Sequence, residues 1–313
     1  MGQLYESIQV VNFIYSRNSG NILKYNFQFF LKILKLQNME KDLKILVYDD
    51  ACPLCSVYTK SFVKAGILQT GGRKCFTELD VSVAQYIDMA RSRNEIPLVN
   101  MQTGEVKYGI EAMTELLGAK WPFITKLMSV SWVYWFFIRL YKIVSYNRRT
   151  ITATSFSKGN FDCKPDFNYK YRFLFMAAGL LLNSLLLLPV HANIFENSGF
   201  HNTSSVQLQL AHFALVLTNI LLAFTLPRNL AFEFLGQVNM LALLVNLMLV
   251  PVILLNKFAI SAIWFNNLLF ILITLFIVKE YIRRMKYAGI IFNRIIVPVN
   301  VASIILFLIY LAL

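Results

Sequence analysis

Negative charge is scarce in this chain. Only 15% of its 313 residues are charged, and 30 Lys and Arg outnumber 17 Asp and Glu, which gives a net charge of +13. Such an excess is common in nucleic-acid-binding proteins, but here the basic residues flank long apolar segments, where attraction to anionic lipid accounts for them. We therefore expect a lipid bilayer, and no nucleic acid, among the partners.

Cysteine is scarce as well, because the chain has only Cys52, Cys55, Cys75 and Cys163. A structural zinc knuckle needs four ligands, and the chain has a single Cys-x-x-Cys pair, so we expect no metal site and no cofactor. No cysteine follows residue 163, which excludes a relay of membrane thiols that would carry electrons across a bilayer. Cys75 and Cys163 are predicted to be structural.

Hydrophobic residues make up 57% of the chain, which is too apolar for an ordinary soluble protein. Residues 171–313 hold only 8 Lys or Arg and 3 Asp or Glu. Five apolar runs there can cross a hydrocarbon core of ~30 Å, which takes about 20 residues: 171–190, 206–226, 231–255, 259–278 and about 293–313. We predict an all-α transmembrane helical bundle over 171–313, after a linker at 151–170.

The loop charges predict the topology. Basic residues precede the first predicted span and follow the fourth, whereas the loop 191–205 has none. By the positive-inside rule, the N-terminal half then lies inside and the C-terminus outside. Residues 1–38 form an N-terminal extension without the pattern of an export signal, and Met39 is an alternative start. These features predict an integral protein of the bacterial cytoplasmic membrane with its N-terminal domain on the cytoplasmic side.

The aromatic segment 121–147 has the length of a further span. Arg139 and Lys142 interrupt it, and a charge at bilayer depth costs at least ~2.5 kcal/mol. We therefore expect an amphipathic helix that is docked on the N-terminal domain or lies in the membrane interface.

The stretch 44–55 places a Cys-Pro-Leu-Cys sequence directly after a short apolar strand, where a helix is predicted to begin. A helix N-terminus stabilises a thiolate and lowers its pKa from ~8.5 to about 3.5–7.5. Cys52 has that position, Pro53 suits the first helical residue, and Cys55 can reach back from one turn later. Cys52 is thus predicted to attack a disulfide as a thiolate, and Cys55 to resolve the mixed disulfide.

Further strands are expected at 73–79, 96–100 and 105–108, with helices at 81–92 and 110–117. The resulting order, βαβαββα, is the order of thioredoxin, so residues 39–150 are predicted to form an α/β thioredoxin-like domain that ends with the aromatic helix. Pro97 falls where thioredoxin-like proteins hold a cis proline against the active-site sulfurs. The alternative is an ordinary proline at the start of a strand.

Two stretches carry a resemblance to a known family: Tyr-Asp-Asp-Ala-Cys-Pro-Leu-Cys at 48–55 and Tyr-Asn-Arg-Arg at 146–149. Together they resemble the DCC thiol-disulfide oxidoreductases over about residues 43–150. The family commonly has Gly after the aspartate, where this chain has Asp50. The resemblance implies a redox role and a thioredoxin-like fold, and the C-terminal bundle lies outside the core pattern of the family.

Three polar residues have open roles at this point. Asp49 is interpreted either as a proton acceptor for Cys55 or as a turn-forming or helix-capping carboxylate. Glu233 and Gln237 lie one turn apart in a predicted span, which indicates a transport or ligand site. A solvated position near the interface is the alternative for Glu233, and the Asn side chains of the spans are candidates for hydrogen bonds between helices.

The sequence thus predicts a membrane-tethered thiol-disulfide oxidoreductase that acts on protein or small-molecule thiols and disulfides. Its site residues are Cys52, Cys55, Asp49 and Pro97, and the bundle raises the local concentration of membrane-associated substrates. One alternative is a non-enzymatic binding or transport protein whose cytoplasmic Cys pair captures a soft metal such as Cu(I). Another is a degenerate domain that only docks a partner.

Overall fold

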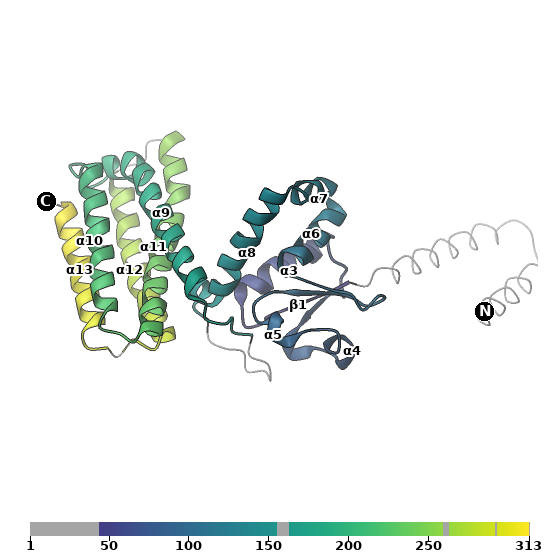
Figure 1. Ribbon diagram of the computed structural model, residues 1–313. Helices are drawn as coiled ribbons and strands as arrows, with labels where there is room; N and C mark the ends of the chain where they lie inside the picture. The colour runs from purple at the N-terminus through teal and green to yellow at the C-terminus, as the bar shows by residue number, and fades with distance from the viewer. Residues whose placement is uncertain (1–43, 155–162, 259–262, 292, 313) are drawn as a thin grey trace, which may run out of the picture.

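The computed structural model describes residues 44–154, 163–258, 263–291 and 293–312, and the expected extension 1–38 lies outside them. Figure 1 shows two parts, a small sheet with its helices and a bundle of long helices, connected by one oblique helix. Four of the helices are long and apolar enough to cross a membrane. The protein therefore combines an α/β domain with a membrane-type helical bundle.

The sheet has four strands in the order β2-β1-β3-β4. Their bounds are Lys44–Tyr48 for β1, Arg73–Cys75 for β2, Pro97–Asn100 for β3 and Val106–Tyr108 for β4. β1 runs parallel to β2 and antiparallel to β3, and β3 is antiparallel to β4. A parallel pair needs a crossover, which α3 (Pro53–Lys64) supplies, whereas a hairpin joins β3 to β4.

Both faces of the sheet are covered. Ile45 and Val47 of β1 point into one apolar cluster, and Leu46 points into a second cluster on the opposite face, because successive side chains of a strand alternate between faces. The second cluster lies under α3 and α6 (Gly109–Lys120). The three central residues of β1 are therefore buried, and the strand holds the start of α3 in a fixed position.

The expected order of strands and helices is present, with two local differences. The helix expected at 81–92 is divided into α4 (Val81–Ala84) and α5 (Met89–Ser92), because the Asp88 side chain accepts hydrogen bonds from the backbone N–H groups of Ala90 and Arg91 and starts a new helix. The strand expected at 73–79 ends at Cys75, and a 3-10 turn, η1 (Phe76–Glu78), follows it.

The aromatic segment forms a bent pair of helices, α7 (Pro122–Met128) and α8 (Ser131–Thr152), which meet at 98°. α8 packs against α6 and α3, and the Tyr141 hydroxyl accepts a hydrogen bond from the Ile96 backbone N–H at 3.0 Å. The helix is thus docked on the domain. Its other face and α7 expose apolar side chains: Phe123, Leu127, Trp132, Trp135, Phe136, Phe137, Leu140 and Val144.

Each of the five predicted spans coincides with a helix, although residues 259–262 of the fourth and residue 313 of the fifth lie outside the described residues. They are α9 (Tyr169–Asn193), α10 (Ser205–Ala223), α11 (Arg228–Phe258), α12 (Ile263–Tyr287) and α13 (Ile296–Ala312), with a 3-10 turn, η2 (Phe195–Asn197), after α9. α9 to α12 have the length and composition of membrane spans, and α13 is shorter, at 17 residues. The bent pair α7–α8 would be a fifth span only if both helices were counted as one.

Asparagine side chains join the helices of the bundle. The Asn183 amide donates to Asn239 Oδ1 at 3.2 Å, and Asn246 donates to Asn183 Oδ1 at 3.1 Å. At the C-terminal end of α9, Asn256 donates to the Asn193 carbonyl at 2.8 Å. These side chains have the role of interhelical hydrogen-bonding groups that the sequence indicated for them.

The end of α8 is bound to the bundle. The guanidinium of Arg284 in α12 donates to the carbonyls of Thr150 and Ile151, both at 3.0 Å, and Arg283 donates to the Ala153 carbonyl at 2.7 Å. These contacts satisfy carbonyls that the C-terminal turn of a helix leaves without intrahelical partners. The linker predicted at 151–170 therefore begins inside a helix that is fixed to the bundle.

Candidate functional site

Cys52 and Cys55 lie at the start of α3, directly after the loop that follows β1. Cys52 is the N-cap residue with extended backbone dihedrals (φ −102°, ψ 106°), and Pro53 occupies the first turn. The backbone N–H of Cys55 donates to Cys52 Sγ at 3.5 Å. This is the local geometry predicted from the sequence, and both cysteines are free thiols.

The two thiols differ in acidity. A hydrogen bond from the Cys55 thiol lowers the pKa of Cys52 to about 7, and the Cys55 backbone N–H and the nearby Arg148 act in the same direction. The same hydrogen bond and burial raise the pKa of Cys55 well above its ordinary value. As the pH rises through about 7, Cys52 is thus the first of the two thiols to ionise, and Cys55 keeps the proton that it donates to the Cys52 thiolate.

The two thiols also differ in access. Cys52 is 0% exposed, whereas Cys55 is 7% exposed and lines a cavity. The sequence-based mechanism has Cys52 as the sulfur that attacks a substrate, so a substrate disulfide reaches it only after the residues around Cys52 move. In the described conformation, Cys55 is the sulfur that an open space reaches.

Asp49 lies in a buried ion cluster. Its side chain is 2% exposed, and Oδ2 lies 3.0 Å from an Arg149 nitrogen and 3.6 Å from Arg148 Nε. Oδ1 accepts a hydrogen bond from the Ala51 backbone N–H at 3.1 Å. Burial raises the pKa of Asp49, and Arg149 and Arg148 oppose that shift. The geometry supports the turn-forming interpretation of Asp49, whereas its role as a proton acceptor for Cys55 stays a prediction.

The two arginines come from the end of α8, about a hundred residues away from the dithiol in the sequence. Arg149 also donates to the Ala51 carbonyl at 3.2 Å, and Arg148 donates to the Cys163 carbonyl at 2.5 Å. They were not among the site residues predicted from the sequence, although the Tyr-Asn-Arg-Arg stretch is part of the family resemblance. The structure thus brings the two halves of that signature together around Asp49.

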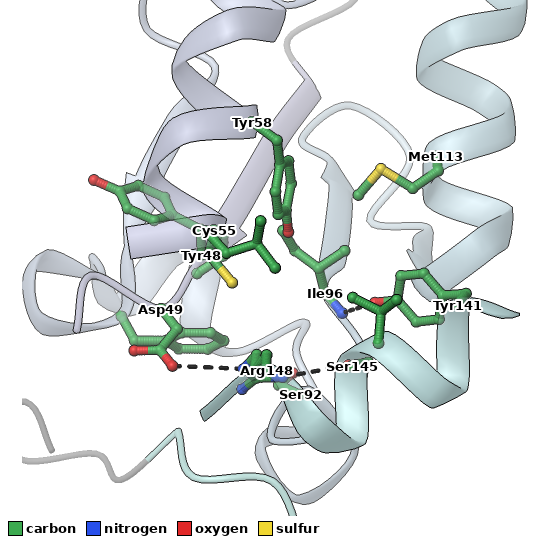
Figure 2. Close-up of a pocket in the computed structure, with 14 residues that line it drawn as sticks. Tyr48, Asp49, Cys55, Tyr58, Ser92, Ile96, Met113, Tyr141, Ser145 and Arg148 are labelled. Atoms are coloured by element: carbon green, nitrogen blue, oxygen red, sulfur yellow. Dashed lines mark hydrogen bonds and ion pairs between the residues drawn. The ribbon is translucent and has the colours of Figure 1, made fainter. Parts of the chain in front are cut away.

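The cavity beside Cys55 has a volume of about 270 Å³. Figure 2 shows it between α3 on one side and α6 and α8 on the other, with Arg148 at its base, paired with Asp49. Its lining is mostly apolar and aromatic: Val47, Tyr48, Leu54, Tyr58, Phe76, Ile96, Met113, Tyr141 and Val144, with Asp49, Ser92, Ser145 and Arg148 as polar members. The site therefore consists of a mostly apolar cavity whose lining includes the Cys55 thiol and the Arg148 guanidinium.

Pro97 was expected to form a cis peptide bond, from its place in the thioredoxin-like order of strands and helices. Every described peptide bond is trans, so this expectation is wrong. Pro97 begins β3 and pairs with Tyr108 of β4, so it has the place of a strand-starting proline. The residue before it, Ile96, lines the cavity together with Cys55. The register of β3 against β4 and the contact of Ile96 with Tyr141 determine this arrangement.

The other two cysteines are buried apart from the cavity. Cys75 ends β2 with its sulfur 3.2 Å from the Thr77 hydroxyl. Cys163 packs in the apolar cluster on the face of the sheet opposite α3, where burial raises its pKa to about 12. Among the described residues, no group of three or more His, Cys, Asp and Glu is placed to hold a metal ion.

Glu233 and Gln237 belong to the junction between α8 and the bundle. Glu233 forms an ion pair with Arg172 at 2.9 Å and accepts a hydrogen bond from the Thr150 hydroxyl at 3.2 Å. Gln237 donates to Glu233 at 2.7 Å and accepts from Arg284 at 2.7 Å. Their polar atoms thus have partners from three other helices, and the contacts indicate a structural role at the junction.

Comparisons with protein-family models, with curated proteins and with solved structures found no match.

Proposed function

We propose that this protein is a membrane-bound thiol-disulfide oxidoreductase whose redox centre is the Cys52–Cys55 dithiol. The observation that carries the proposal is the asymmetry of the pair. Cys52 caps α3 with a pKa of about 7, while Cys55 keeps its proton and donates it to Cys52. A dithiol used for exchange needs one sulfur as a thiolate and a second sulfur close enough to resolve the intermediate.

The domain architecture supports the same proposal. The βαβαββα order, the strand order β2-β1-β3-β4 and the dithiol between β1 and α3 agree with a thioredoxin-like domain. The cluster of Asp49 with Arg148 and Arg149 uses both stretches in which the chain resembles the DCC family. We interpret the α/β part as a member of that class, with the trans Pro97 as a departure from it.

In the proposed reaction, the Cys52 thiolate attacks one sulfur of a substrate disulfide and the other substrate sulfur leaves as a thiolate. Cys55 then loses its proton and attacks the Cys52 sulfur of the mixed disulfide. The Cys52–Cys55 bond forms, the second substrate thiol is released, and two electrons have passed to the substrate. Arg148 favours the Cys55 thiolate that this step needs, because its charge lowers the pKa of Cys55.

The loop charges support a cytoplasmic position for this domain. Basic side chains lie near the ends of α9 and α12 that meet the domain, and the loop 191–205 at the opposite end has none. We therefore place the dithiol at the inner face of a bacterial cytoplasmic membrane, where the pair would exchange with protein or small-molecule thiols.

A redox titration tests the function. The full-length protein in detergent is equilibrated with mixtures of reduced and oxidised glutathione, and free thiols are counted by mass spectrometry after acid quenching and alkylation. A reversible two-electron transition confined to Cys52 and Cys55 is expected, and the Cys75→Ser variant keeps it. The proposal fails if the pair stays reduced under all mixtures, or if it binds Cu(I) and does not form a disulfide.

A further inference from the structure

The cavity beside Cys55 has the size and lining of a site for a small apolar ring compound. Ligand pockets usually measure ~300–1,000 Å³, so a chamber of about 270 Å³ takes one small molecule and not the loop of a folded protein. Four aromatic residues contribute to its lining, Tyr48, Phe76, Tyr58 and Tyr141. Flat aromatic side chains pack well against a flat ring.

The outer wall of the cavity is part of the exposed apolar face of α8. Val144 lines the cavity and is 38% exposed, and Leu140 and Phe137 continue the same face one and two turns earlier. In Figure 1, α8 runs obliquely down to the foot of the bundle, whose helices have the length of membrane spans. Its exposed apolar side chains are the part of the cavity wall that a lipid-dissolved molecule can contact.

The polar groups of the cavity are suited to an oxygen that becomes negative. Arg148 lines the chamber at its base, and its guanidinium also favours thiolates at Cys55 and Cys52. A buried cation beside a reacting ring stabilises charge that develops in the reaction far better than water-exposed groups do. The cavity therefore combines a thiol, a largely apolar and aromatic lining, and a guanidinium that is paired with Asp49.

We propose that this cavity binds a membrane-dissolved quinone, which reoxidises the dithiol. The proposal rests on the proposed function, because it supplies the electron acceptor for a dithiol that exchanges with thiols. It also gives a reason for the difference in access, since the sulfur that faces the cavity is Cys55 and the buried thiolate is Cys52.

Cys55 loses its proton and its sulfur adds to a ring carbon, so that an S–C bond forms and the ring gains an electron pair with negative charge on an oxygen near Arg148. The Cys52 thiolate then attacks the Cys55 sulfur. The S–S bond forms, the S–C bond breaks, and its electron pair stays on the ring. The resulting quinol takes one proton that Cys55 released and one from solvent.

The test uses the full-length protein in phospholipid vesicles, reduced and kept under argon. A short-chain ubiquinone is added, and formation of the Cys52–Cys55 disulfide and loss of quinone absorbance are followed together. A parallel sample receives oxidised glutathione instead. We expect quinone to oxidise the dithiol at a rate that saturates with its concentration, with one quinol formed for each disulfide.

Two variants fill the cavity, Met113→Trp from α6 and Val144→Trp from α8, and Val57→Trp is the matched control on the exposed side of α3. We expect the filled variants to lose roughly tenfold or more of their quinone rate relative to their glutathione rate, because a misfit in an apolar pocket costs about that factor. The control keeps the ratio of the wild type. Val144 is partly exposed, so its variant tests the proposal if Met113→Trp fails to fold.

The outcomes separate the two proposals. If glutathione oxidises the dithiol and quinone does not, the proposed function stands and the quinone site is refuted. Equal losses of both rates in the filled variants, or a quinone rate that the variants leave unchanged, also refute the site, because the quinone then reacts elsewhere or without binding. If neither oxidant forms the disulfide, the proposed function itself fails.

Discussion

Replacing Asp49 with Asn tests the ion cluster that holds the dithiol loop. Asn keeps an oxygen for the Ala51 N–H but removes the charge opposite Arg148 and Arg149, which are 6% and 3% exposed. A buried charge that loses its partner costs about 3–5 kcal/mol. Because Asp49 also raises the pKa of Cys52, the substitution is expected to lower that pKa below about 7 as well as to destabilise the domain.

The assay is thermal unfolding in detergent, followed by near-ultraviolet circular dichroism, together with a pH titration of thiolate absorbance. A loss of this size lowers the midpoint by roughly 10 °C or more. Asp50→Asn is the matched control, because Asp50 is exposed and accepts a hydrogen bond only from the Thr77 hydroxyl among the described contacts, so its change is within about 0.5 kcal/mol. Equal midpoints for the two variants would refute the cluster as a source of stability.

Three further predictions concern acidity, the junction and topology. Thiolate absorbance of the reduced protein should rise through about pH 7 as Cys52 ionises. The free energy of unfolding should rise from there toward pH 9, because an acid whose pKa is lowered in the folded state loses its stabilising contribution as the pH falls through that pKa. A flat absorbance titration over this range would contradict the Cys52 assignment. Arg284→Gln removes a side chain that is 1% exposed from the Thr150 and Ile151 carbonyls and should lower the unfolding midpoint well below that of Lys286→Gln, whose side chain is exposed on the same helix. Similar midpoints would show that the Arg284 contacts at the junction add little. A C-terminal alkaline phosphatase fusion should be active and one after residue 118 inactive, whereas activity at both points would overturn the cytoplasmic placement.

Local sequence patterns predicted the features that depend on near neighbours. Helix-capping preferences predicted Cys52 as the N-cap and Pro53 in the first turn of α3. The length of the apolar runs predicted the helices α9 to α12. The same patterns predicted the order of the strands and helices along the chain. The division of the helix at 81–92 was missed, although Asp is a preferred N-cap residue and the Asp88 side chain caps α5.

Contacts between distant residues were not predictable in the same way. Nothing near Asp49 in the sequence indicates that Arg148 and Arg149 would surround it, since they lie about a hundred residues away in an aromatic helix. The extension of α8 to Thr152 was missed for a related reason, because Arg284 of α12 binds its last carbonyls.

The measurement that tests the central claim most directly is trapping of a mixed disulfide. Cys55→Ser protein is expressed in cells, its thiols are blocked with acid and alkylating reagent, and disulfide-linked partners are identified by mass spectrometry, with Cys52→Ser and Cys75→Ser as parallel samples. The account predicts partners linked to Cys52 in the Cys55→Ser protein, lost on reduction and absent from Cys52→Ser. The proposed function would be contradicted if the Cys52→Ser sample held disulfide-linked partners in equal amount. It would also be contradicted if no sample held any, while glutathione readily oxidises the purified wild type.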